Sequence, residues 1–373
     1  MNEYLQVSKV KNKDAAFSKE DVLSVSGDYG IVNQIEFQGR SFAGVSVAAY
    51  GVVETGDVVY TKSPLKSNPY GIIKTNKGKT GIVSTLYAVY KPLNNVHSEF
   101  VQIYFEQDAR MNNYMHSLVN KGAKNDMKVS DENALKGEVF FPSKDEQIKI
   151  SKYFGKIDHL IALHQRKCDE TKKLKKFMLQ KMFPKKDAKK PEIRFAGFTN
   201  DWEQRKLNEV AEFNPKSELP DEFEYVDLES VVGTEMISHR TETKDSAPSR
   251  AQRLAQPGDV FFQTVRPYQK NNYLFSKLDN NYVFSTGYAQ MRPNIDTAFL
   301  MSFLQTDSFV KIVLDNCTGT SYPAINSSDL SNLEISLPKS FEEQKKVGKT
   351  IISIDNLITL HRRAYYNKKG GLT

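Results

Sequence analysis

The sequence predicts an α+β chain in which two similar β-rich domains are separated by an antiparallel intramolecular coiled coil of two long helices. Three observations support this fold class. The 373-residue chain repeats itself with an offset near 200 residues, each copy begins with short β-like runs, and each copy ends in a stretch of heptad-like apolar spacing. Because both copies belong to one chain, the two equivalent helices most simply pack on each other.

The repeat divides the chain into five predicted segments. A first β-rich domain covers residues 1–143, and a spacer helix follows at 144–183. A linker at 184–200 leads to the second β-rich domain at 201–340, and a shorter spacer helix occupies 341–373. The strand-like runs are bounded by Gly, Pro, Asn and Lys, which are the residues that usually end strands.

The repeat consists of an ordered series of matched residue groups. Helix residues recur at an offset of 197, and residues of the β-rich parts recur at offsets up to 202, as loop insertions would produce. Chance does not give matches in this order. The matched groups are Glu146-Gln147 with Glu343-Gln344, Ile157-Asp158 with Ile354-Asp355, Leu163-His164 with Leu360-His361, Gly56-Asp57-Val58 with Gly258-Asp259-Val260, and Lys91-Pro92 with Arg292-Pro293.

Both helices carry apolar residues at alternating steps of four and three, a seam too narrow for a globular core helix and typical of a coiled coil. At 1.5 Å per residue the first helix would be ~60 Å long, which exceeds one turn of B-DNA at about 34–36 Å. His164 and Cys168 are interpreted as packing residues, because no second ligand pair accompanies them. The predicted seam comprises Ile150, Phe154, Ile157, Ile161, His164, Cys168, Val347, Ile351, Ile354, Ile358, His361 and Tyr365.

Composition limits the class of protein. The 52 Lys and Arg residues exceed the 45 Asp and Glu residues, which gives a net charge of +7. Residues 166–190 alone hold eleven Lys or Arg and three acidic residues, so the rest of the chain sums to −1 and overall basicity says little about nucleic-acid binding. Two cysteines exclude a disulfide scaffold and a Cys-rich zinc module. No apolar run reaches the ~18 residues that span a bilayer, and we expect a cytoplasmic protein that does not insert into membranes.

Several motifs resemble the specificity subunit of type I restriction–modification enzymes. They are Trp202-Glu203-Gln204-Arg205-Lys206-Leu207, Gly319-Thr320-Ser321-Tyr322-Pro323-Ala324-Ile325-Asn326, the linker Pro191-Glu192-Ile193-Arg194-Phe195-Ala196-Gly197-Phe198, and the Leu-His element of both helices. The resemblance covers essentially the whole chain. It implies that the β-rich domains are target-recognition domains, that each reads one half of a split duplex DNA site, and that the paired helices hold them apart.

The same resemblance implies partners rather than chemistry. In this family methylation and cleavage belong to separate chains, so we expect a non-catalytic subunit that docks two modification (methyltransferase) subunits and the restriction subunits. S-adenosylmethionine, ATP and Mg²⁺ would bind those partners, and neither a cofactor nor a metal is expected on this chain. The ends depart from the family pattern. Residues 3–8 align with residues 224–229, so the counterpart of Trp202–Phe213 is expected to be missing, and the second helix stops early.

A reader of duplex DNA needs cations for phosphates and planar or amide groups for base edges. After the Gly56-Asp57 turn, the first domain offers Lys62, Ser63, Lys66, Asn68, Tyr70, Lys74, Lys77 and Lys79. The corresponding stretch of the second domain offers Arg266, Tyr268, Gln269, Lys270, Asn271, Asn272 and Tyr273. The loops before the long helices add Lys121, Lys124, Thr320, Ser321 and Tyr322. For any one of these residues, a solvated loop side chain is an equally good interpretation.

Two other classes of protein fit less well. A Mg-dependent nuclease would use Asp221, Glu242 and Lys244, but Glu242 is expected in a polar stretch without strand alternation. Neither a complete adenine-methyltransferase box nor a complete phosphate-binding loop is present. A non-catalytic coiled-coil adaptor would explain the helices, but not two β-rich domains of equal layout.

Overall fold

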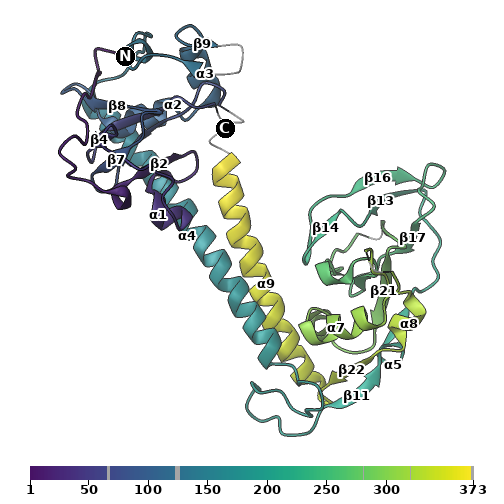
Figure 1. The fold of residues 1–373 in the computed structure, drawn as a ribbon. Coiled ribbons are helices and arrows are strands. Elements are labelled where there is room, and N and C mark those ends of the chain that lie inside the picture. The colour runs from purple at the N-terminus through teal and green to yellow at the C-terminus, as the bar shows by residue number, and fades with distance from the viewer. Residues whose placement is uncertain (65–67, 122–126, 280, 320, 371–373) are drawn as a thin grey trace. The chain divides into compact units, whose positions relative to one another are not determined.

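The computed structural model describes residues 1–64, 68–121, 127–279, 281–319 and 321–370. The chain forms two compact units, residues 1–160 (unit 1) and 161–370 (unit 2), and each is considered by itself. The boundary lies inside the long helix α4 (Lys144–Lys181), which Figure 1 shows in teal.

Unit 1 is built on a four-stranded antiparallel sheet of order β1-β8-β5-β6. Helices α2 and α3 bury Val101, Phe105 and Met111 against Tyr60 and Tyr90 of this sheet in one apolar cluster. The elements are β1 (Leu5–Val7), β2 (Leu23–Ser26), β3 (Gly30–Asn33), α1 (Gln34–Gln38), β4 (Gly51–Val53), β5 (Val58–Thr61), β6 (Ile73–Thr75), β7 (Gly81–Val83), β8 (Tyr87–Pro92), α2 (Ser98–Phe105), α3 (Asp108–His116), β9 (Asn120–Lys121), β10 (Met127–Lys128) and the start of α4.

Unit 2 contains the antiparallel sheet β12-β21-β18-β19 and a second sheet of order β16-β13-β20-β17. The elements after α4 are β11 (Glu203–Lys206), α5 (Leu207–Val210), β12 (Ala211–Phe213), β13 (Glu222–Val226), β14 (Val231–Val232), β15 (Glu235–Met236), β16 (Arg240–Thr243), β17 (Ala251–Leu254), β18 (Val260–Gln263), β19 (Tyr273–Leu274), β20 (Tyr282–Ser285), β21 (Tyr288–Pro293), α6 (Thr297–Leu304), α7 (Asp307–Asp315), α8 (Ser327–Ser331), β22 (Glu334–Leu337) and α9 (Phe341–Gly370).

The two units repeat one plan. In each, the aspartate of the Gly-Asp-Val turn is buried and pairs with a cation at the end of the neighbouring strand: Asp57 with Lys91 at 2.9 Å, and Asp259 with Arg292 at 2.9 Å. The glycine before each aspartate has a φ of +92° or +96°, a backbone conformation that favours glycine. The predicted repeat is therefore confirmed at the level of sheet order and side-chain contacts.

The long helices also begin in the same way. Gln147 donates to the carbonyl of Pro142 at 2.8 Å and accepts the backbone N–H of the residue before α2 at 2.8 Å. Gln344, its counterpart at an offset of 197, donates to the carbonyl of Pro338 at 2.9 Å and accepts the N–H of the residue before α6 at 3.1 Å. Each glutamine thus ties a long helix to the globular part of its own unit.

Strand β1 corrects the alignment of the two copies. It pairs with β8 so that Leu5 lies opposite Pro92, and β12 pairs with β21 so that Ala211 lies opposite Pro293. β1 is therefore the counterpart of β12, and the expected alignment of residues 3–8 with β13 is wrong. A three-residue strand carries too little sequence to be aligned by residue identity alone.

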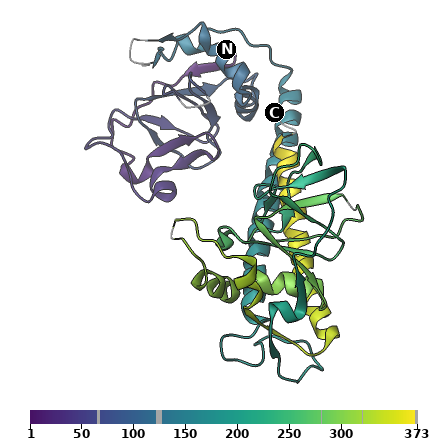
Figure 2. The ribbon, with the colours of Figure 1, turned by 90° about the vertical axis from the view of Figure 1, so that its right-hand side faces the viewer.

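Within unit 2, α4 and α9 lie side by side in both views (Figures 1 and 2). His164 lies beside His361, with their Nδ1 atoms 3.4 Å apart. Farther along α4, Lys175 pairs at 2.6 Å with Asp355, which precedes His361 on α9. The residue numbers of these contacts increase along α4 and decrease along α9. The predicted antiparallel arrangement is therefore confirmed for this part of the helix pair.

The seam is shorter than the sequence predicts. Cys168, Ile354 and Ile358 form the buried cluster between the helices. Val347 and Ile351 pack instead in the globular core of unit 2, because Gly348 lets α6 come so close that a Cβ there would lie 2.4 Å from the Phe299 nitrogen. The side chain of Tyr365 lies outside the described residues, and the other predicted seam positions are half-buried: Ile150, Phe154, Ile157 and Ile161.

Candidate nucleic-acid interface

The loop between β18 and β19, residues 264–272, is anchored by side-chain hydrogen bonds. Asn272 is 1% exposed and accepts the backbone N–H of Gln263 at 2.9 Å. Gln263 in turn donates to the side-chain oxygen of Gln269 at 3.1 Å. Arg266 and Lys270 have φ values of +54° and +55°, which cost about 1 kcal/mol each. Strained backbone of this kind persists only where the surroundings hold it, and it is concentrated at functional sites.

A second loop, residues 318–324, meets this first loop. The N–H of Arg266 donates to the carbonyl of Pro323 at 2.7 Å, and its guanidinium lies 4.5 Å from the centre of the Tyr322 ring. A cation over an aromatic face is a favourable arrangement. The structure thus joins two stretches that the sequence proposes separately, and Thr320 of the second loop lies outside the described residues.

Polar and aromatic side chains are presented together on these two loops. Tyr268 is 50% exposed and Tyr322 is 63% exposed. Gln269 and Ser321 are also exposed, and Arg266 is half-buried. A guanidinium, an amide, a hydroxyl and aromatic rings are the groups that contact base edges and phosphates. We name this set of five residues the unit 2 loop surface.

Other predicted residues of this stretch have internal roles. Lys270 pairs with Asp307 and holds the pKa of that carboxyl below its ordinary value. Asn271 accepts a backbone N–H from the turn between β14 and β15 at 2.8 Å. Asn272 is buried, so its predicted DNA contact is wrong, whereas Tyr273 is half-buried against the aromatic core of the unit and its contact stays a prediction.

The predicted DNA-binding lysines of unit 1, from Lys62 to Lys79, are less available for phosphate contacts than their number suggests. Three of these lysines form ion pairs at 2.9, 3.1 and 3.3 Å: Lys62 with Asp131, Lys74 with Glu106 and Lys77 with Glu99. Because the side chain of Lys74 is only 9% exposed, its predicted phosphate contact is wrong. Sequence reasoning missed these pairs, since two of the acidic partners lie 32 and 69 residues away and no local pattern reports them.

The remaining predicted residues of unit 1 divide into three groups. Asn68 and Tyr70 are each 8% exposed, and Asn68 donates to Asp108 at 3.0 Å, so both are packing residues and their predicted DNA contacts are wrong. Ser63 is half-buried and Lys79 is exposed. Lys66, Lys124 and the side chain of Lys121 lie outside the described residues.

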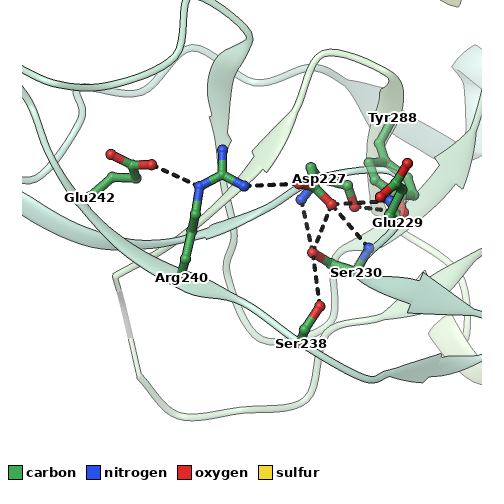
Figure 3. A network of polar contacts seen from close by, with 7 residues as sticks. All are labelled: Asp227, Glu229, Ser230, Ser238, Arg240, Glu242 and Tyr288. Atoms are coloured by element: carbon green, nitrogen blue, oxygen red, sulfur yellow. Dashed lines mark hydrogen bonds and ion pairs between the residues drawn. The ribbon is translucent and has the colours of Figure 1, made fainter.

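One acidic residue of the alternative nuclease prediction, Glu242, is neutralised by a neighbour. Glu242 lies in strand β16, so the expectation that it lies outside a strand is wrong. Its carboxylate accepts from Arg240 at 2.8 Å (Figure 3). Within the described ranges, no group of three or more His, Cys, Asp and Glu side chains could hold a metal ion.

No single helix of the described residues is long and apolar enough to cross a membrane. The bent pair α6 and α7 passes that test together by length and composition only. Helix α6 is nevertheless a core helix, because six of its residues are buried in unit 2.

Comparison with known proteins agrees with this architecture. Residues 199–367 match the family model described as the type I restriction modification DNA specificity domain. The specificity subunit of the type I restriction enzyme MjaVIII from Methanocaldococcus jannaschii is 27% identical in an alignment of 243 residues that covers 60% of this chain and 56% of that protein. The HindI specificity subunit from Haemophilus influenzae is 24% identical in an alignment of 176 residues that covers 43% of this chain and 37% of that protein. The chain thus spans about half or less of the length of these curated relatives.

A solved structure shares the fold. The crystal structure of the S subunit of a type I restriction-modification system from M. genitalium has a TM-score of 0.59 and 14% sequence identity, and the match covers 100% of this chain and 92% of that one. Two repeated α+β units with antiparallel helices are therefore a fold that this S subunit shares. The match to the family model lies within residues 199–367, and the likeness to the solved structure is one of fold.

Proposed function

We propose that this chain is the DNA-recognition subunit of a type I restriction–modification enzyme and reads a two-part duplex site with one β-rich domain per half-site. The duplication carries this proposal. Both units have one four-stranded sheet of the same strand order, the same buried aspartate turn and the same glutamine-anchored helix, while their loops differ in sequence. A two-part DNA site with two different half-sites requires two units of the same architecture whose DNA-contacting loops differ in sequence.

The chain acts as a reader and a scaffold. Methyl transfer and cleavage, with S-adenosylmethionine, ATP and Mg²⁺, are assigned to modification and restriction subunits bound to it. The groups of the unit 2 loop surface suit recognition: Gln269 for base edges, Arg266 for bases or phosphates, and the tyrosine hydroxyls for hydrogen bonds to phosphate oxygens.

The long helices supply two equivalent docking surfaces for two modification subunits. A groove on α4 is lined by Lys152, Lys156, His159 and Leu160, and a groove on α9 is lined by Lys349, Ser353 and Leu357, among others. Leu160 and Leu357 are 40% and 48% exposed and occupy corresponding positions of the repeat. An exposed leucine flanked by lysines suits an apolar contact with an acidic rim.

Selection from a library of random duplexes by the full-length chain, alone and with its modification subunit, tests the reading function. Enrichment of a two-part motif, with affinity that falls steeply with salt concentration, supports the proposal. A chain that self-associates tightly but enriches no duplex would contradict it and favour the coiled-coil adaptor.

The unit 2 loop surface has its own test. The paired substitution Arg266→Ala with Gln269→Ala is expected to relax or change one half-site and leave the other intact, and each bidentate hydrogen-bonded pair with a base that it removes should cost about 1–3 kcal/mol. The control pair, Arg205→Ala with Gln204→Ala, removes the same residue types from β11 and should leave the selected motif unchanged. If the loop variant selects the wild-type motif with wild-type affinity, the assignment of this loop is wrong.

The docking surfaces are tested by stoichiometry. Leu160→Arg and Leu357→Arg should each reduce the number of bound modification subunits from two to one in native mass spectrometry, and together to none. Leu174 is also 48% exposed but lies outside both grooves, so Leu174→Arg is the control. Two bound subunits in both single variants would exclude these surfaces.

A further inference from the structure

The β14–β15 hairpin connects the unit 2 loop surface to helix α9. On the helix side, the carboxylate of Glu235 accepts from Arg362 at 3.2 Å and from Arg363 at 3.1 and 2.8 Å. The Thr359 hydroxyl lies 3.5 Å away. The side chain of Glu235 is only 16% exposed, so this carboxylate is mostly removed from water and held by two cations of one helix.

The same hairpin also contacts the loop of residues 264–272, which carries part of the unit 2 loop surface. The backbone N–H of Gly233, in the turn between β14 and β15, donates to the side-chain oxygen of Asn271 at 2.8 Å. Gly233 has a φ of +65°, which glycine adopts without strain. Asn271 directly follows the backbone of Gln269 and Lys270, so the hairpin turn fixes the end of the loop that presents Arg266 and Gln269.

The base of the hairpin is fixed by a polar network (Figure 3). The Asp227 carboxylate accepts from the backbone N–H of Ser230 at 3.1 Å, from its hydroxyl at 2.9 Å, and from Arg240 at 2.9 Å. Burial alone would raise the pKa of Asp227, but the hydrogen bonds from Ser230 and Arg240 hold it below its ordinary value. The Ile237 N–H closes the hairpin by donating to the Ser230 carbonyl at 2.8 Å.

We propose that Glu235 is a positioning residue that holds the unit 2 loop surface at a fixed angle to α9 and thereby sets which spacer length between the half-sites is accepted. The inference rests on the proposed function. One base pair more or less moves a half-site by about 3.4 Å and rotates it by about 35° around the duplex axis. If the unit 2 loop surface is fixed to α9, the chain should bind poorly to a duplex whose half-site is displaced in this way. If the link through Glu235 is broken, the chain should bind such a duplex more nearly as well as the preferred one.

A role in stability alone gives a different expectation. Arg363 is 67% exposed, so its own pair with Glu235 contributes little to stability, and the pair with Arg362, which is 32% exposed, carries most of any such contribution. If Glu235 fixes the loop surface to α9, its removal changes how the binding affinity depends on spacer length. If Glu235 only stabilises the fold, its removal lowers the fraction of folded chain and reduces binding equally for every duplex. The two roles are therefore separated by a ratio of affinities rather than by affinity itself.

The experiment measures binding of the full-length chain to duplexes that carry both selected half-sites, with spacers up to about two base pairs shorter or longer than the preferred one. For the wild type we expect the preferred spacer to bind at least about tenfold more tightly than its neighbours. Glu235→Arg should reduce this ratio to about threefold or less while the selected half-site sequences stay the same. Charge reversal of the partners in the same chain, Arg362→Glu with Arg363→Glu, should restore the wild-type ratio.

Glu218→Arg makes the same charge change at an exposed residue of unit 2 and should leave the ratio unchanged. Glu235→Gln, which removes only the charge, is measured in parallel and gives the answer if Glu235→Arg fails to fold. Wild-type ratios in both Glu235 variants, or an equal loss in the Glu218 control, would overturn the proposal. A wild-type chain that enriches no two-part motif would instead refute the proposed function.

Discussion

Replacing Lys175 with methionine removes the ammonium that faces Asp355 across the helix pair and keeps most of the side-chain volume. The two groups lie 2.6 Å apart, and their side chains are 15% and 11% exposed. Burial raises the pKa of the Asp355 carboxyl, and the Lys175 ammonium offsets only part of that rise. The methionine variant therefore leaves a carboxylate in the interior with its nearest counter-charge gone.

The expected loss follows from that burial. Removing one partner of a buried ion pair costs about 3–5 kcal/mol, because the other charge stays buried without compensation. We expect about 3 kcal/mol, at the lower end of this range, since Arg362 also attracts the Asp355 carboxylate. At about 2–4 °C per kcal/mol for a unit of this size, the melting temperature of unit 2 should fall by about 6–12 °C.

The loss should also depend on pH. The folded protein binds the Asp355 proton more tightly than the unfolded chain does, so the charged form costs stability above the ordinary pKa of an aspartate. Lys175→Met raises the folded pKa further. The deficit relative to wild type should therefore be smaller at about pH 5 than at about pH 7.5.

Urea denaturation followed by tryptophan fluorescence measures this loss. Trp202 is the only tryptophan of the chain and packs against Phe183 and Phe299 in the core of unit 2, so its emission reports on that unit. The matched control is Lys172→Met on the same helix, where the pair with Asp169 is about half exposed and should contribute less than about 0.5 kcal/mol.

A double variant separates the buried charge from general damage to the helix. The free energy of unfolding of the double variant, Lys175→Met with Asp355→Leu, should be within about 1 kcal/mol of the wild-type value, because neither charge of the pair is left buried. The reasoning is refuted if Lys175→Met alone is as stable as Lys172→Met, or if the double variant is no more stable than Lys175→Met.

Two further substitutions test the cores of the two units. Arg194→Met should cost unit 2 about 3 kcal/mol in the same fluorescence assay, because Glu343 is 2% exposed and loses its partner at 2.7 Å; an unchanged midpoint would contradict this. Gly71→Ala should cost unit 1 about 3 kcal/mol or more by calorimetry, since φ is +82° and the new Cβ would lie 1.9 Å from the Thr61 carbonyl oxygen. Gly78→Ala, with its nearest contact at 3.6 Å, is the control and should change stability by less than about 0.5 kcal/mol; equal effects at both glycines would refute the steric argument.

The sequence by itself determined the plan of this protein. The spacing of Cys168 and of Ile354 with Ile358 predicts a helix seam, and these residues form it. The matched Gly-Asp-Val turns and the matched glutamines Gln147 and Gln344 predict one domain repeated twice, and the aspartates and glutamines have equivalent contacts in the two copies. Such features are readable because they depend on neighbours in the chain: helical periodicity and turn chemistry are local.

Only the tertiary structure decided which side chains are free to act. Lys74 lies in a basic stretch that predicts phosphate contacts, but Glu106 neutralises its charge. Val347 lies at the spacing of the predicted coiled-coil seam, but it packs in the globular core of unit 2. Arg266 stands over Tyr322 because two distant loops fold onto each other. These outcomes depend on contacts between residues far apart in the chain, which form when loops close and cores pack, and no local pattern of residues encodes them.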